Sequence, residues 1–156
     1  MLKRKIVKIK SLIREAVELE NKLAYHILND YAEIGEESIE EINADTKVYT
    51  DAMESSDLEE KFSGDFTLIV FFGNYEITIT GDYIGSISKG NNDDNPENQT
   101  PTETLMTYVN VDEITIAEKD GEIFFESKGS NIPKELLSKI EERLSDTILN
   151  QLEDEL

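Results

Sequence analysis

The chain has 156 residues and a mass of 17.7 kDa, with 35 acidic residues against 15 Lys and Arg, so its formal net charge is -20. This length suits one domain, and a hydrophobic fraction of 38% supports a single core while excluding fibrous and transmembrane classes. Zero Cys and one His exclude disulfides and thiolate catalysis, and they disfavour imidazole chemistry and His-rich metal sites.

The charge is distributed unevenly along the chain. Residues 1–14 contain no acid and six bases, which are Lys3, Arg4, Lys5, Lys8, Lys10 and Arg14. The remaining residues hold nine bases and all 35 acids, a net charge of -26. Because such an acidic body repels nucleic acid and anionic membranes, we expect it not to bind nucleic acid directly. The basic tip could contact phosphates, anionic lipid or the acidic body of a neighbouring copy, or it could be only a solubilising helix end.

Residues 1–43 are predicted to form a helical N-terminal region. Apolar residues recur at spacings of three, four or seven along a long helix that ends near Ile34. Such a helix spans about 50 Å, whereas a compact globule of this length is about 40 Å across, so its first turns would overhang. The overhang would expose an apolar stripe, made of Leu2, Ile6, Ile9 and Ile13, unless another chain covers it. The alternative is a helix that breaks near Asn21 and folds back.

After Gly35 the pattern predicts a short second helix over residues 36–42. Its acidic surface consists of Glu36, Glu37, Glu40 and Glu41. Residues 43–64 are polar and are predicted to form a connector with one helical turn over residues 57–61.

An antiparallel sheet of about five strands, built from two hairpins, is predicted over residues 65–128. The first hairpin turns at Gly73-Asn74, the composition that a type II′ turn prefers, and places Phe72 opposite Tyr75. A third strand is predicted near residues 83–88. Side-chain alternation directs one face to the core and leaves Ile69 and Phe71 on the opposite face. These two side chains need cover from the connector, the N-terminal helix or a partner.

The second hairpin is predicted over residues 105–118 and 122–127, with a type I′ turn at Asp120-Gly121. Its inward residues would be Ile114, Ile116, Ile123 and Phe125. Between the hairpins, residues 89–104 contain no apolar residue and many turn-forming residues, so they are predicted to form a polar loop. The Asp93-Asp94-Asn95 cluster lacks the Gly and Glu positions of an EF-hand.

A C-terminal helix is predicted over residues 131–156, beginning near Pro133 and packing across the sheet. Its apolar residues recur every three or four positions, and they are Leu137, Ile140, Leu144, Ile148, Leu152 and Leu156. The expected fold is therefore a single α+β domain over residues 1–156.

No nucleophile elbow, phosphate loop or dinucleotide fingerprint occurs in the chain. His26 and Asp30 stand one helical turn apart and can pair, but one His with one carboxylate is too few ligands for a metal. The sequence therefore predicts a protein that is not an enzyme and has no catalytic, cofactor-binding or metal site.

These features favour a non-catalytic protein–protein interaction or assembly component that forms a homo-oligomer or larger complex. Such a component could be a subunit of a phage virion or of another ring-like bacterial complex, in which the basic tip of one copy meets the acidic body of the next. The alternative is an acidic inhibitor that mimics nucleic acid and binds a DNA- or RNA-binding host-defence protein. The expected location is cytoplasmic, or the virion if the protein is phage-encoded, and no membrane span is expected.

Overall fold

A computed structural model describes residues 21–33, 38–90 and 95–154. These residues form three helices and a five-stranded antiparallel sheet, which confirms the predicted α+β class. Helical residues 21–33 come first, and then follow β1 (Ile39–Ala44), α2 (Thr46–Glu54), β2 (Glu59–Phe72), β3 (Tyr75–Ser88), β4 (Glu103–Glu118), β5 (Ile123–Lys128) and α3 (Lys134–Asp154). Short 3₁₀ turns lie at Pro96–Asn98 and Gly129–Asn131.

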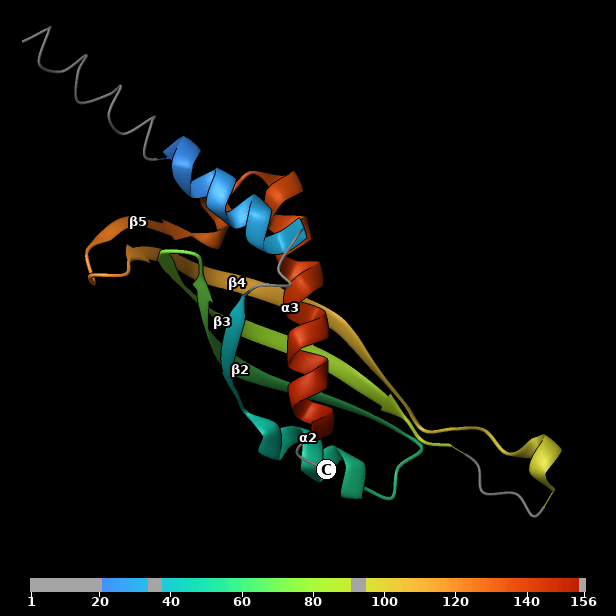
Figure 1. Ribbon diagram of the computed structural model, residues 1–156. Coiled ribbons are helices and arrows are strands. Elements are labelled where there is room, and N and C mark those ends of the chain that lie inside the picture. The colour runs from blue at the N-terminus through green and yellow to red at the C-terminus, as the bar shows by residue number, and fades with distance from the viewer. Residues whose placement is uncertain (1–20, 34–37, 91–94, 155–156) are drawn as a thin grey trace, which may run out of the picture.

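The sheet is a meander in which each strand pairs with its neighbour in the chain, in the order β1-β2-β3-β4-β5 (Figure 1). β2 and β3 pair over their full length, from Glu59 opposite Ser88 to Phe72 opposite Tyr75. Gly73 between them has a φ of 60°, which suits the first central position of a type II′ turn.

All the described helices pack on one face of the sheet (Figure 1). α3 contributes one buried residue per turn, because its apolar residues recur every four positions. The buried helical residues are Ala24, Ile27, Leu28, Tyr31, Tyr49, Ala52, Leu136, Ile140, Leu144, Ile148 and Leu152. They join one core with the alternate residues of the strands, including Phe62, Phe66, Leu68, Val70, Ile77, Ile79, Tyr83, Ile114 and Ile116.

Two predicted helical segments are strand instead. The short helix expected over residues 36–42 is wrong where the structure describes it, because Ile39–Ala44 is β1 and pairs antiparallel with β2. The helical turn expected over residues 57–61 is also wrong, since β2 begins at Glu59. The helix of the connector lies earlier, over Thr46–Glu54, where Tyr49 and Ala52 reach the core.

β3 runs without a break through Gly81, where the sequence predicted the end of one strand and the start of another. Gly81 lies against a β-bulge of β4, in which Asp112 is the extra residue between the pairs Thr80↔Glu113 and Gly81↔Val111. A Cβ on Gly81 would lie 1.9 Å from the backbone oxygen of Asn110. The glycine therefore permits close approach of β4 and does not end the strand.

The β4–β5 turn also differs from its prediction. Only Gly121 has positive φ (95°), and its N–H donates to the Glu118 carbonyl, whereas a type I′ turn needs positive φ at two central residues. The register then shifts between Ile116 and Ala117, so Ile123 is 55% exposed and the prediction that it points inward is wrong. Ile114, Ile116 and Phe125 are buried as predicted.

Tyr83 connects the start of α2 to the sheet. Its Oη donates a 2.6 Å hydrogen bond to the Asp45 carbonyl, and the Asp45 N–H donates to the Asp65 carbonyl of β2. Burial raises the pKa of Tyr83 to about 12, and the nearby carboxylates of Asp45 and Asp65 add to this shift. The phenol therefore stays protonated in the folded protein at pH values that ionise an ordinary tyrosine.

This shift predicts a loss of stability between about pH 10 and pH 12, because the unfolded chain releases the Tyr83 proton first. The variant Tyr83→Phe should lose about 0.5–1.5 kcal/mol at neutral pH with the hydrogen bond to Asp45, and it should then show a shallower alkaline decline. Urea unfolding as a function of pH tests both points. An alkaline decline identical in the two proteins would contradict the assignment to Tyr83.

Candidate interaction surface

The sheet face opposite the helices, called here the outer face, is not covered by any described helix. Its residues alternate along each strand with buried ones, as the register of β2 shows most clearly. Ile69 is part-buried and Phe71 is 41% exposed on this face, so the predicted cover by the connector or by the helix is not provided by residues 43–64 or by helical residues 21–33.

Exposed apolar side chains gather on the outer face. Eight large hydrophobic residues are exposed in the described ranges, and two of them, Leu23 and Leu58, lie outside the strands. The other six take outer-face positions by register, and these are Ile39, Phe71, Ile84, Leu105, Tyr108 and Ile123. Clustering of this kind on one face is typical of an interaction surface.

Carboxylates cross the middle of the same face. Asp65 of β2 lies directly opposite Asp82 of β3, and Asp82 lies opposite Asn110 of β4. The Asn110 amide Nδ2 donates to Asp82 Oδ1 at 2.9 Å and to Asp112 Oδ1 at 2.8 Å, so the bulged Asp112 also faces outward. Asp65, Asp82, Asn110 and Asp112 are called here the aspartate band.

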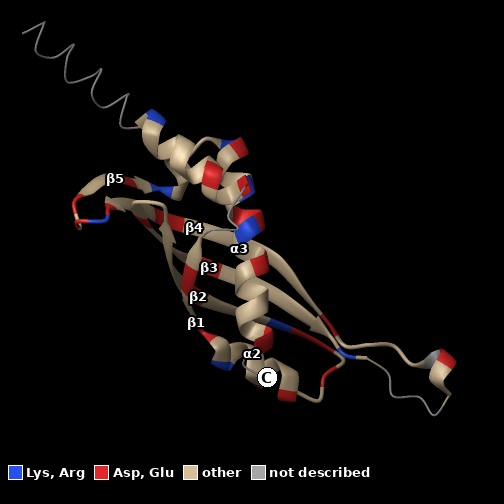
Figure 2. Cartoon of the chain, viewed as in Figure 1, with Lys and Arg blue, Asp and Glu red and all other residues tan. Residues whose placement is uncertain are grey.

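The aspartate band makes no ion pair with a described residue. The ion pairs found among the described residues join His26 to Asp30, Lys139 to Glu33 and Arg143 to Glu40, and none of them reaches the band. Like charges directly opposite on neighbouring strands repel each other and destabilise the sheet. Figure 2 shows that Lys and Arg are also sparse over the strands as a whole. The band therefore attracts positive charge from outside the described fold.

A hollow of about 480 Å³ lies at the β2–β3 turn. It is lined by Ile39, Phe71, Phe72, Gly73, Tyr75, Glu76 and Lys119. Two of the exposed apolar residues of the outer face, Ile39 and Phe71, thus border a concave surface. This end of the face can receive an apolar side chain.

Most of the sequence-predicted interaction residues lie outside the described residues. These are the six bases of the tip, the stripe of Leu2, Ile6, Ile9 and Ile13, and the acids Glu36 and Glu37. Glu41 is exposed on the outer face, as its place in β1 dictates. Glu40 was predicted to be part of an acidic surface, and this prediction is wrong. Strand alternation in β1 turns its side chain toward α3, where it accepts a hydrogen bond from Arg143.

Glu40 joins three segments at a partly buried junction. Its Oε1 accepts from Arg143 Nε at 2.9 Å and Nη2 at 2.6 Å, and its Oε2 accepts from Thr147 Oγ1 at 2.9 Å. Arg143 also lies over the Tyr31 ring at 4.7 Å, a cation–π distance. Burial raises the pKa of Tyr31 far above the usual range, and the charge of Glu40 raises it further. These contacts give Glu40 a structural role.

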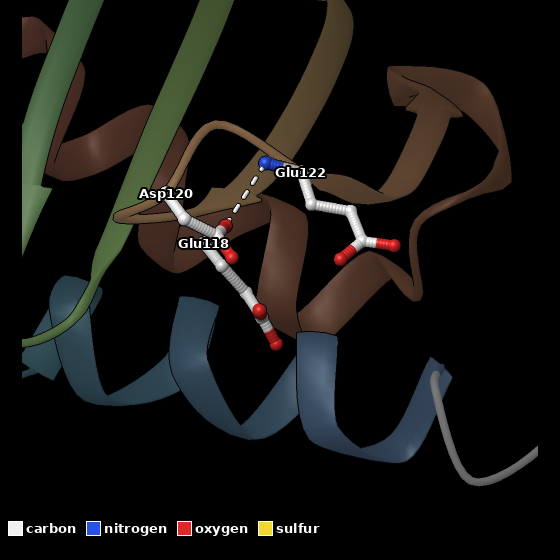
Figure 3. Close-up of side chains that lie close together, drawn as sticks. All are labelled: Glu118, Asp120 and Glu122. Atoms are coloured by element: carbon white, nitrogen blue, oxygen red, sulfur yellow. Dashed lines mark hydrogen bonds between the residues drawn. The ribbon is translucent and has the colours of Figure 1, made fainter.

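One group of acids could hold a metal ion by position alone. Glu118, Asp120 and Glu122 surround the β4–β5 turn, with ligand oxygens within 4.8 Å of one another (Figure 3). All three are exposed, and Asp120 accepts a 3.2 Å hydrogen bond from the Glu122 N–H, which shapes the turn. His26 pairs with Asp30 at 3.3 Å, as predicted, on the surface of helical residues 21–33.

Comparison with known proteins found no matching family model, curated protein or solved structure. Among the described helices, none combines the length and apolarity needed to cross a membrane.

Sequence reasoning found Ile69, Phe71 and Glu41 but missed the aspartate band, Ile84 and Tyr108. The signal for Ile84 was present, because it alternates with the buried residues Tyr83 and Gly85. The aspartate band had no such signal in the sequence, because the bulge at Asp112 breaks the alternation and places Asp112 and Glu113 on the same face.

Proposed function

We propose that the protein is a non-catalytic assembly component that associates with other copies of itself through the outer face. The observation that carries this proposal is the gathering of six exposed apolar residues on the one sheet face that no described helix covers. Large apolar side chains left in water favour association, and carboxylates among them restrict which surface can approach.

The outer face suits a protein partner better than a nucleic-acid-like role. A nucleic-acid mimic relies on carboxylates that take the place of phosphates, whereas here Phe71, Ile84 and Tyr108 stand among the acids with exposures of 39–50%. The excess of acids on the same strands also disfavours direct contact with phosphates.

The test is the solution mass by size-exclusion chromatography with light scattering over a series of protein concentrations. We expect a mass above the 17.7 kDa of one chain. The double variant Phe71→Ser and Ile84→Ser should shift the mass toward the monomer, because it removes apolar area from the outer face.

The matched control is Leu23→Ser, which removes a side chain of similar exposure (44%) from helical residues 21–33. It should keep the mass of the unaltered protein. A monomer at every concentration, or an equal effect of the control, would contradict the proposal. A salt-reversible complex with a basic-grooved nucleic-acid protein would instead favour the mimic.

A further inference from the structure

We propose that the occupant of the outer face is the basic N-terminal segment, residues 1–14, of a second copy of this chain. This inference rests on the proposed function and identifies the part of the partner that docks. Three observations support it, namely the charge of the face, the apolar residues that flank the aspartate band, and the length of the segment.

The charge of the outer face is opposite to that of the segment. By register, the face carries nine acids and two lysines, and these are Glu41, Glu59, Asp65, Glu76, Asp82, Glu103, Asp112, Glu113, Glu126, Lys61 and Lys128. Residues 1–14 carry six bases and no acid. Cations placed over the aspartate band would relieve the repulsion between Asp65 and Asp82, which form no ion pair with a described residue.

The apolar residues of the face complete the match. Ile84 and Tyr108 flank one side of the aspartate band, and Phe71 and Ile39 border the hollow beyond the other. The segment offers apolar residues between its bases, and these are Leu2, Ile6, Val7, Ile9, Leu12 and Ile13. Acids elsewhere lack this arrangement. On α3, Glu142 and Asp146 stand beside Lys139 and Arg143 rather than beside exposed large hydrophobics.

The length of the segment is also sufficient. Along β2, the distance from Ser63, opposite Ile84, to Phe71 is eight residues, or about 26 Å at 3.3 Å per residue. Fourteen residues reach about 46 Å when extended. An extended segment can therefore cover both apolar flanks and the aspartate band between them, whereas the same residues as the helix that the sequence predicts would span about 21 Å and cover the band with one flank.

A charge-swap experiment with full-length chains tests the inference. The tip variant has Lys3→Glu, Lys5→Glu, Lys8→Glu and Lys10→Glu, and the face variant has Asp65→Lys, Asp82→Lys and Asp112→Lys. In each variant alone the tip and the aspartate-band positions carry charge of the same sign, so self-association should weaken by about tenfold or more. An equimolar mixture should regain association, because the acidic tip then meets the basic band positions of the face variant and the basic tip meets the acidic band of the tip variant.

Controls separate this inference from the proposed function. Glu135→Lys, Glu142→Lys and Asp146→Lys make the same charge change at exposed positions of α3, and this variant should keep the wild-type mass. The tip variant alters no described residue, so it remains informative if the face variant is unstable. Full association by the tip variant, or no gain on mixing, overturns docking of residues 1–14 while the Phe71 and Ile84 result still stands. A monomeric wild-type protein overturns both proposals.

Discussion

The variant Gly81→Ala is expected to destabilise the protein by about 3 kcal/mol or more and to weaken the association proposed for the outer face. A Cβ at this position would lie 1.9 Å from the Asn110 carbonyl oxygen and 3.0 Å from both its carbon and the Phe66 ring. The backbone of β4 cannot yield without breaking its pairing with β3, so overpacking here exceeds the range seen for ordinary core insertions. Urea unfolding measures the loss, and light scattering follows association.

Gly73→Ala is the matched control. Nothing lies within 4 Å of a Cβ on Gly73, but its φ of 60° is left-handed, so the change should cost about 1–2 kcal/mol of backbone strain. The structure therefore predicts that replacing Gly73, which is uncrowded but left-handed, costs less stability than replacing Gly81, which is crowded but has no positive φ. Equal losses for the two variants would contradict the close approach of β3 and β4 at the aspartate band.

Local patterns were sufficient to predict the sheet class and the last helix. The alternation along β2 separates buried Leu68 and Val70 from Ile69 and Phe71. The period of α3 places Ile140, Leu144 and Ile148 in the core. In each case the periodicity of the sequence agrees with the final burial, because one layer of helices covers one face of the sheet.

β1 could not be predicted from local patterns. The acidic run before Ile42 favours a helix by propensity, since Glu is a good helix former. The segment is a strand because its six residues pair with residues 66–71 of β2, from Ala44 opposite Phe66 to Ile39 opposite Phe71. These partners lie 22 to 32 positions further along the chain. Tertiary pairing thus overrides propensity, and it turns Glu40 from the expected acidic surface toward Arg143.

The candidate surface was predictable in part for a related reason. Strand alternation alone placed Phe71 outside the core, and the uneven charge suggested that the basic tip meets the acidic body of a neighbouring copy. The aspartate band depends on two features that a period of two does not encode, the continuity of β3 through Gly81 and the extra residue Asp112. Bulges of this kind redirect side chains at the sites where they occur.

Breaking the junction at Glu40 should have the second-largest effect on stability. Glu40→Gln removes the carboxylate that pairs with the partly buried Arg143, and we expect a loss of about 2–3 kcal/mol. The value lies below that of a fully buried pair because the two side chains keep 17% and 25% exposure. Arg143→Met should lose a similar amount, since it also removes the contact with the Tyr31 ring.

A double-mutant cycle then separates the pair from its surroundings. Combining Glu40→Gln with Arg143→Met should cost less than the two single losses together, because no charge is left unpaired. The exposed pair of Glu33 and Lys139 provides the comparison, since its side chains are 50% and 45% exposed and its coupling should stay below about 1 kcal/mol. Raising the salt concentration should weaken this exposed pair more than the junction. Equal coupling energies for both pairs would show that Glu40 behaves as the simple acidic surface residue that the sequence predicted.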